Sequence, residues 1–518
     1  MQLIRRLTGL LSFFVLLLSA PFSPHAGSIE SGGSDTADIA DLVIFYTSDT
    51  HGYIVSDENT IGLDRVAAIK NSVPGSLLVD AGDFLHGKPL ATMSQGKDVV
   101  RLMKKAGYFA AAAGNHEFAY LREALKNRSR EAQTPPNRML ILSANVREDD
   151  GSLLLPRDAI TDMEGVRVCM FGLTTDETQR QARASSVAGL HFVNPIPIAQ
   201  TVGRALRARG CQVVLALTHI GSDPAHPNNS REVAFWAPEI DAIIDGHSHK
   251  VVEERIGESR ILVSPGAHGE HVGRLDIRYD KAKKRITHIG NMLLDAQSAA
   301  SYQPEPELAA ELTAMQTQLD ERLSLVVGNV GTDLPGADKI SFIRETALGC
   351  LYADALRSAY GDDIALVNGG ALRSGLRKGE ITRGDVFTAL PFNDLAISVS
   401  VTGQELLDML EYGFSHLPKK SGAFPQLSGL IVHVKAANPP GKRIASVVLA
   451  DGSPLDVTRT YTLSTNAFLA DGGDGYPHFS AKPKRKAFRF VDDAVIHFIQ
   501  NHDTSGYTDG EPSRIIFD

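Results

Sequence analysis

Short apolar runs alternate with amphipathic stretches through the first part of the chain. Leu42–Thr47 (LVIFYT), Ser76–Asp80 (SLLVD) and Tyr108–Ala113 are continuous apolar runs, which are typical of strands buried on both faces. Between these runs, Gly62–Asn71 and Asp98–Ala106 carry apolar residues at helical spacing. This alternation predicts an α/β domain built around a largely parallel sheet.

The same alternation continues further along the chain. Leu140–Ala144, Val166–Leu173 and Val213–Thr218 predict three more strands, and Pro197–Arg209 predicts a helix. Residues 126–139 are mostly polar, and we interpret them as a polar excursion before the next strand.

A long amphipathic segment divides the chain. From Glu305 to Leu323, apolar positions recur at helical spacing between charged residues, which predicts a helix joining two domains. A length of 518 residues also favours at least two domains. We expect a first domain at 40–300, a linker helix at 305–325 and a second domain at 326–518.

The first residues have the pattern of a signal peptide. Arg5 and Arg6 precede an apolar run that ends at Pro21, and a small-residue cleavage region lies near Ala26. The alternative is a membrane anchor, but the run is shorter than the roughly 20 residues that span a bilayer. We therefore predict a signal peptide at 1–26, no stable membrane anchor, and a periplasmic or secreted protein.

Composition narrows the class of protein. The chain is 43% hydrophobic and 22% charged, as in soluble globular proteins. A net charge of -9 argues against nucleic acid as a partner. Three cysteines, Cys169, Cys211 and Cys350, lie in apolar settings and are odd in number, so we expect buried small hydrophobes rather than a disulfide framework.

Metal-binding side chains follow four of these predicted strands and a fifth strand predicted within Pro238–Asp245. Each alone is more often structural, but the set combines carboxylate, amide and imidazole donors without thiolates. It predicts two divalent ions (Zn, Mn, Co or Fe) roughly 3.5 to 4 Å apart, bridged by Asp83 and a hydroxide. The residues are Asp49, His51, Asp83, Asn115, His219, His247 and His249, with His116 beside Asn115.

The second domain carries candidate ligand-binding residues in three glycine-rich turns. Arg373 and Arg377 suit a phosphate or carboxylate group, although solvated surface arginines are the alternative. Phe424 and Phe468 could clamp a flat ring, or each could fill the core. Asp474 lies in the turn DGGDGY, where glycines allow close approach to a ligand.

The five strand-end stretches, among them GNHE and DGHSH, resemble the calcineurin-like metallophosphoesterase signature. NGGALR, GAFPQ and NAFLADGGDGY resemble the C-terminal domain of the bacterial 5'-nucleotidase/UDP-sugar hydrolase family, so the similarity covers nearly the whole chain. The resemblance implies a four-layer α/β/β/α metallophosphoesterase sandwich, a linker helix and a C-terminal α/β substrate-binding domain.

The resemblance also implies roles for these residues. It implies that His116 stabilises the transition state while a metal-bridging hydroxide attacks the phosphate ester of a nucleotide in line. Asp49, His51, Asp83 and His249 would hold one ion, and Asp83, Asn115, His219 and His247 the other. Arg373 and Arg377 would bind phosphate or nucleoside groups, Phe424 and Phe468 the base, and Asp474 the ribose.

Two residues depart from the family pattern. Ala119 stands where the family usually has an Asp that orients the catalytic His, and Ser48 stands where it often has Asn. Three activities therefore stay in view: a 5'-nucleotidase that also accepts UDP-sugars or nucleoside diphosphates, a thiosulfohydrolase-like or cyclic-phosphodiesterase relative, and a non-catalytic periplasmic nucleotide-binding protein. The sequence leaves the oligomeric state and the metal identity open.

Overall fold

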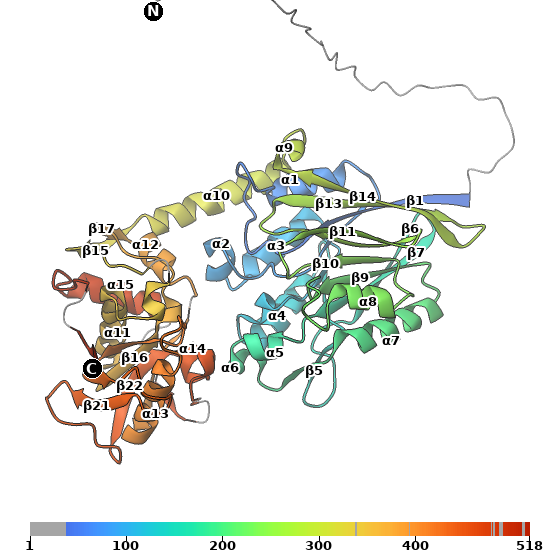
Figure 1. The fold of residues 1–518 in the computed structure, drawn as a ribbon. Helices are drawn as coiled ribbons and strands as arrows, with labels where there is room; N and C mark the ends of the chain where they lie inside the picture. The colour runs from blue at the N-terminus through green and yellow to red at the C-terminus, as the bar shows by residue number, and fades with distance from the viewer. Residues whose placement is uncertain are drawn as a thin grey trace, which may run out of the picture. The chain divides into compact units, whose positions relative to one another are not determined.

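The computed structural model describes residues 38–336, 339–392, 394–477, 479, 482–485, 490–509 and 513–518 (Figure 1). The predicted signal peptide at 1–26 lies outside the described residues. Within the described ranges, no helix is long and apolar enough to cross a membrane.

Two six-stranded sheets form the first part of the fold. The first has the order β14-β13-β1-β2-β3-β4, and the second has the order β11-β12-β10-β9-β7-β6. The first contains β1 (Ile39–Thr47), β2 (Leu77–Asp80), β3 (Ala110–Ala112), β4 (Leu140–Leu142), β13 (His271–Asp280) and β14 (Arg285–Asp295). The second contains β6 (Asp158–Met163), β7 (Val166–Thr174), β9 (Val213–His219), β10 (Ala242–Asp245), β11 (Val251–Ile256) and β12 (Arg260–Pro265).

The side chains of alternate strand residues fill separate hydrophobic layers. Along β1, Ile44 and Tyr46 belong to a core that also contains Leu215 of β9, so this core lies between the sheets. Phe45 packs instead with the helices that cover the first sheet, and Phe171 packs with those that cover the second. The predicted four-layer α/β/β/α sandwich is therefore confirmed (Figure 1).

Several helices and shorter strands complete this part of the chain. They are α1 (Leu63–Asn71), α2 (Pro89–Met93), α3 (Lys97–Ala106), α4 (Arg122–Ala132), β5 (Val146–Glu148), α5 (Thr178–Gln181), α6 (Ala184–Val187), β8 (Leu190–Phe192), α7 (Pro195–Ala208), α8 (Ser230–Trp236) and α9 (Ala296–Ala299). The long helix predicted from Glu305 to Leu323 is present as α10 (Pro306–Leu323).

A mixed five-stranded sheet organises the rest of the chain. Its order is β19-β16-β22-β18-β23, and separate hydrophobic clusters cover its two faces. The elements are β15 (Val326–Val330), α11 (Ala347–Tyr360), β16 (Ile364–Asn368), β17 (Gly379–Thr382), α12 (Arg383–Ala389), β18 (Ala396–Thr402), α13 (Gly403–Phe414), β19 (Pro425–Ser428), β20 (Leu430–Val434), β21 (Ile444–Leu449), β22 (Thr460–Asn466), α14 (Ala467–Ala470), β23 (Lys484–Arg485), α15 (Val491–Asn501) and β24 (Ile515–Phe517). This sheet gives the second half its own α/β core.

The polar excursion predicted at 126–139 contains a helix over its first half, which the sequence analysis did not identify. Helix α4 runs from Arg122 to Ala132 and buries Leu125, Ser129 and Ala132. These three positions follow helical spacing, but two of them are small. The apolar stripe was therefore too weak to distinguish the helix from a polar loop.

The prediction that the cysteines are unpaired is wrong for two of them. Cys169 in β7 and Cys211, just before β9, form a disulfide with their Cα atoms 5.8 Å apart. The pairing of Val168 with Val213 brings these neighbouring strands together, which the sequence spacing does not show. Cys350 is free and buried, and it accounts for the odd count.

We predict that the double substitution C169A/C211A lowers the free energy of unfolding by about 2–4 kcal/mol, because the disulfide closes a long loop in the unfolded chain. Urea unfolding with and without reductant measures the difference. Reductant should destabilise the natural protein and a C350A control equally, while leaving the double variant unchanged. Equal stability of the double variant and the oxidised natural protein would contradict the prediction.

Candidate metal centre and adjoining pocket

Five side chains of the predicted metal site come from residues with left-handed backbone. The φ angles are 50° at Asp49, 45° at His51, 61° at Asp83, 76° at His247 and 55° at His249. Non-glycine residues adopt this region at a cost, on the order of 1–3 kcal/mol each, and such residues concentrate at functional sites. The sharp turns after β1, β2 and β10 therefore serve to aim these side chains.

One cluster of donor atoms forms around Asp49. His249 Nε2 lies 3.4 Å from Asp49 Oδ1 and 3.1 Å from His51 Nε2. His51 Nε2 also lies 3.7 Å from Asp83 Oδ2. The imidazole and carboxylate atoms expected to hold the first ion thus converge from three loops.

A second group of donors lies around Asp83. His219 Nε2 is 3.0 Å from Asp83 Oδ2 and 3.8 Å from Asp49 Oδ1. Asn115 Oδ1 and His247 Nδ1 are 2.9 Å apart. Both carboxylates thus lie near donors of the two groups, and Asp83 is the closer of the two to His219.

The charge and hydrogen bonding of His219 fit a cation at this position. Its Nδ1 lies 2.8 Å from the Ala81 carbonyl oxygen, which leaves the buried Nε2 facing the carboxylate of Asp83. Burial by itself lowers the pKa of His219, but Asp83 and Asp49 together raise it to about 10. The two carboxylates therefore favour a proton on His219 Nε2 when no metal is bound. A divalent ion facing Nε2 would replace that proton and supply the positive charge instead.

Glu117 fixes the backbone that carries Asp83. Its Oε2 accepts hydrogen bonds from the N–H groups of Asp83 (2.8 Å) and Gly114 (2.6 Å). Its Oε1 accepts from the N–H groups of Phe84 and Leu85, both at 2.9 Å. One buried carboxylate thus joins the turn after β2 to the turn after β3.

Gly246 leaves the space in which the loops meet. A Cβ atom there would lie 2.2 Å from Ser48 Oγ and 2.7 Å from Asp49 Oδ2, so no larger residue fits. Ser48 Oγ donates a hydrogen bond of 2.5 Å to Asp49 Oδ2. Ser48 therefore orients the metal-site carboxylate.

His116 lies at the edge of the metal cluster. Its backbone N–H donates to Asp83 Oδ1 at 2.8 Å. The ring of His51 meets its ring edge-on, with centroids 4.8 Å apart, and the ring of His86 stacks on it at 5.5 Å with an interplanar angle of 21°. Burial, followed by the nearby imidazoles of His116 and His51, lowers the pKa of His86 to about 3.

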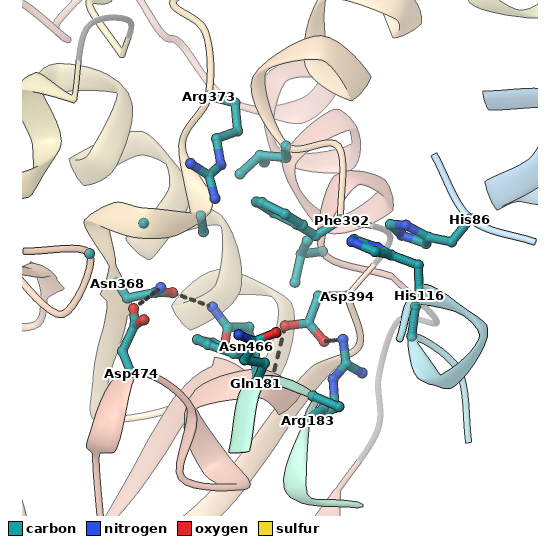
Figure 2. A pocket seen from close by; sticks show the side chains of 18 of the residues that line it. His86, His116, Gln181, Arg183, Asn368, Arg373, Phe392, Asp394, Asn466 and Asp474 are labelled. Atoms are coloured by element: carbon teal, nitrogen blue, oxygen red, sulfur yellow. Dashed lines mark hydrogen bonds and ion pairs between the residues drawn. The ribbon is translucent and has the colours of Figure 1, made fainter. Parts of the chain in front are cut away.

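A cavity of about 530 Å³ adjoins the metal cluster. His116 and His86 line one side, and Figure 2 shows their rings side by side and facing the cavity. Asp474 and Asn368 also line it, and Asn368 Nδ2 donates to Asp474 Oδ2 at 2.8 Å. The cavity thus joins metal-site residues to polar groups of the second half of the chain.

Three of the five predicted substrate-binding residues line this cavity, namely Arg373, Phe468 and Asp474. Phe424 is not among the residues that line the cavity, so the structure does not bring it together with Phe468 there. The Phe424 side chain is only 1% exposed and meets Phe414 edge-on in the hydrophobic core. Arg377 is exposed and is not among the residues that line the cavity.

The structure adds cavity residues that sequence reasoning missed. Phe392 is 39% exposed and lies 4.8 Å from the guanidinium carbon of Arg373. Arg183 and Asp394 both line the cavity and form an ion pair at 3.0 Å. The sequence shows His86 and Glu117 only as residues close in the chain to predicted metal ligands. No motif or regular spacing indicates which residues they contact.

Two family models match the chain. Residues 42–251 match the calcineurin-like phosphoesterase model, and residues 326–481 match the model of the 5'-nucleotidase C-terminal domain. The chain therefore combines a calcineurin-like phosphoesterase domain with a 5'-nucleotidase C-terminal domain. Members of the calcineurin-like phosphoesterase group use two divalent metals, which agrees with the donor clusters described above.

Relatives of the 5'-nucleotidase family cover most of the chain. The "5'-nucleotidase" of Vibrio cholerae is 26% identical over 88% of this chain and 89% of its own length. The trifunctional nucleotide phosphoesterase YfkN of Bacillus subtilis is 28% identical over 87% of this chain, which spans 33% of that protein. The crystal structure of a 5'-nucleotidase precursor from Thermus thermophilus matches with a TM-score of 0.61 and 26% identity, covering 92% of this chain and 99% of that one.

We predict that Glu117→Gln lowers the free energy of unfolding by about 1–3 kcal/mol, because the amide group cannot accept all four backbone N–H groups. Displacement of Asp83 should also lower the metal content, measured by elemental analysis after reconstitution. Glu258→Gln, on an exposed turn, is the matched control and should leave both quantities unchanged. Full stability and metal content in the Glu117 variant would refute the role assigned to the carboxylate.

Proposed function

We propose that the protein is an exported hydrolase that releases phosphate from nucleotides at a two-metal site. The observation that carries the proposal is the position of Asn115 and His116. Asn115 contacts metal-site His247, and His116 lies beside metal-site His51, while both residues line the cavity that also holds Arg373 and Asp474. A phosphate ester at the metals would therefore extend into a cavity with groups suited to a nucleoside.

The donor clusters support the division of the metal ligands that the family resemblance implies. Asp83 would serve both ions, because its Oδ2 lies 3.7 Å from His51 Nε2 and 3.0 Å from His219 Nε2. When bound, the ions supply charge neutralisation at the phosphate and an activated water. Asp49, His51, Asp83 and His249 would hold one ion, and Asp83, Asn115, His219 and His247 would hold the other.

His116 is the residue of this chain that we assign to the transition state. Its ring faces the cavity beside the metal cluster and is available to donate a hydrogen bond to a phosphate oxygen (Figure 2). Charge that builds up on that oxygen would be neutralised by a donor already in place. Arg373 supplies a second, charged donor on the other side of the cavity.

The nucleoside is assigned to the rest of the cavity. Phe468 offers an apolar ring there, and Asp474 is held by Asn368 with its carboxylate in position to accept hydrogen bonds from ribose hydroxyls. Burial raises the pKa of Asp474 from its ordinary value, while Asn368 and Arg373 oppose that shift. These contacts favour a nucleotide over a substrate without a sugar.

Export is supported by two independent features. The first residues have the pattern of a signal peptide, and Cys169 and Cys211 form a disulfide. Disulfides persist in oxidising compartments and are rare in the cytosol. We therefore assign the mature protein to the periplasm or the exterior of the cell.

The function is tested by phosphate release from the purified mature protein, stripped of metal and then reloaded with Mn, Zn or Co. We expect metal-dependent release from AMP. UDP-glucose and bis(p-nitrophenyl) phosphate in parallel measure activity toward nucleotide sugars and phosphodiesters. A folded protein that binds two metals but leaves AMP intact would refute the proposal, and tight AMP binding without turnover would identify a binding protein.

Phe468→Ala should raise KM for AMP by about 5-fold to 150-fold, equivalent to a stacking contact of about 1–3 kcal/mol, with kcat unchanged. Ribose 5-phosphate lacks a base, so its KM should not change in the variant. Phe235→Ala is the control, because that ring is 72% exposed on α8, away from the cavity. An unchanged KM for AMP would remove Phe468 from the base site.

A further inference from the structure

The ring of His116 lies within 4.8 Å of the Asp83 carboxylate but makes no hydrogen bond to it. The hydrogen bonds of this residue are made by its backbone, whose N–H donates to Asp83 Oδ1 and whose carbonyl oxygen accepts from the Ala119 N–H. Ala119 also lines the cavity and has no polar side chain. Within the part of the chain that the structure describes, no hydrogen bond fixes the His116 ring.

Without a hydrogen bond, the side-chain torsions of a histidine do not fix the orientation of its ring plane. Rotation about the bond between Cβ and the ring has a broad energy profile, unlike the staggered wells of saturated carbons. A neighbouring flat group can narrow this rotation by stacking, because tilting the ring then loses contact on one whole face. The position of His116 therefore depends on which rings pack against it.

His86 supplies such a face. Its ring stacks on that of His116 at 5.5 Å and 21°, whereas His51 meets His116 at 90°. Figure 2 shows the two rings nearly parallel. A stacked ring restrains the plane of its neighbour, and an edge-on ring does so less because it contacts a smaller area.

His86 is itself held in place from several directions. Its carbonyl oxygen lies 3.2 Å from His51 Nδ1. The next residue, Gly87, exchanges hydrogen bonds with Thr92, whose hydroxyl donates to the Gly87 carbonyl at 2.8 Å. The ring of Tyr120 packs against His86 edge-on at 5.7 Å.

Tyr120 does not itself orient the ring of His116. Its hydroxyl donates to the carbonyl oxygen of Thr92 at 3.4 Å, which directs it to the backbone of that segment. The ring contact of Tyr120 is with His86. Tyr120 thus supports His86, and His86 is the residue that touches His116.

We propose that His86 is a positioning residue, which holds the ring of His116 in its catalytic orientation by stacking in a site where position 119 carries no carboxylate. This inference rests on the role proposed above for His116. His86 transfers no proton in this proposal, because the flat face of its ring is sufficient to orient His116.

The first test compares His86→Ala, which removes the face, with His86→Phe, which keeps a flat ring and removes both nitrogens. We expect His86→Ala to lower kcat for AMP about 10-fold to 100-fold, as when an orienting partner is lost, with KM unchanged. His86→Phe should retain most of kcat. His191→Ala is the matched control, because that imidazole is exposed and paired with Asp149.

The second test asks whether another substitution restores kcat to the His86→Ala variant. A variant that had only lost stability would not recover activity in this way. Adding Ala119→Asp to His86→Ala should restore kcat, because a carboxylate at that position supplies an alternative orienting group. The same change in the natural protein should have a smaller effect. Metal content and melting temperature are measured for every variant, so that misfolding is recognised.

The third measure does not depend on turnover. Crystal structures of His86→Ala and His86→Phe with metals bound should show the His116 ring in several orientations in the first variant and one in the second. An ordered His116 ring in His86→Ala would overturn the proposal, as would equal loss of kcat in both variants. If the natural protein fails to hydrolyse AMP, the proposed function fails, and ring order still decides the role of His86.

Discussion

Asp49 and Asp83 place two carboxylates in the buried ends of neighbouring strands, and the rest of the site depends on compensating their charge. Asp49 is fully buried and Asp83 is 1% exposed. Burial of unpaired charge is costly unless cations and hydrogen bonds replace water. The imidazoles of His219 and His116 hold the pKa of Asp83 well below its usual range despite burial. Divalent ions would provide the larger compensation, which explains why nearly every donor in the cluster is a metal-binding type.

The sandwich makes this concentration of charge possible. Strands β1, β2 and β3 run parallel in one sheet, and β7, β9 and β10 run parallel in the other. Parallel strands end at a common edge, so donors from two sheets meet without long side chains. The backbone there is strained, and Glu117 and Gly246 hold the turns in that conformation. Stability from the hydrophobic layers supports a site that is locally unfavourable.

The sequence predicted best the features that leave a regular pattern. Apolar runs identified β1 and β9, and the polar residues directly after these runs identified Asp49 and His219, because the end of a buried strand fixes where the next side chains lie. Helix α4 was missed because small residues occupy its buried face. The Cys169–Cys211 disulfide was missed because it depends on strand order, which short-range patterns do not encode.

The residues that line the substrate cavity were the hardest to predict, because they too depend on how distant parts of the chain pack together. Phe424 and Phe468 have similar local settings, yet the first packs in the core and the second lines the cavity. Which of them is accessible depends on the packing of α13 and β19, since Phe414 covers the ring of Phe424. Phe392 and His86 show the converse, because neither belongs to a motif and both face the cavity.

Position 119 carries Ala rather than a carboxylate, so two roles that one carboxylate could fill are divided between other residues. A carboxylate bonded to a histidine fixes the ring plane and also stabilises the ring when it is protonated. The stacked ring of His86 performs the first task and adds no negative charge. The carboxylate of Asp83, which lies within 4.8 Å of the His116 ring and accepts its backbone N–H, supplies the nearby negative charge. Orientation by packing and stabilisation by charge are thus divided between two residues, and neither requires a polar side chain at Ala119.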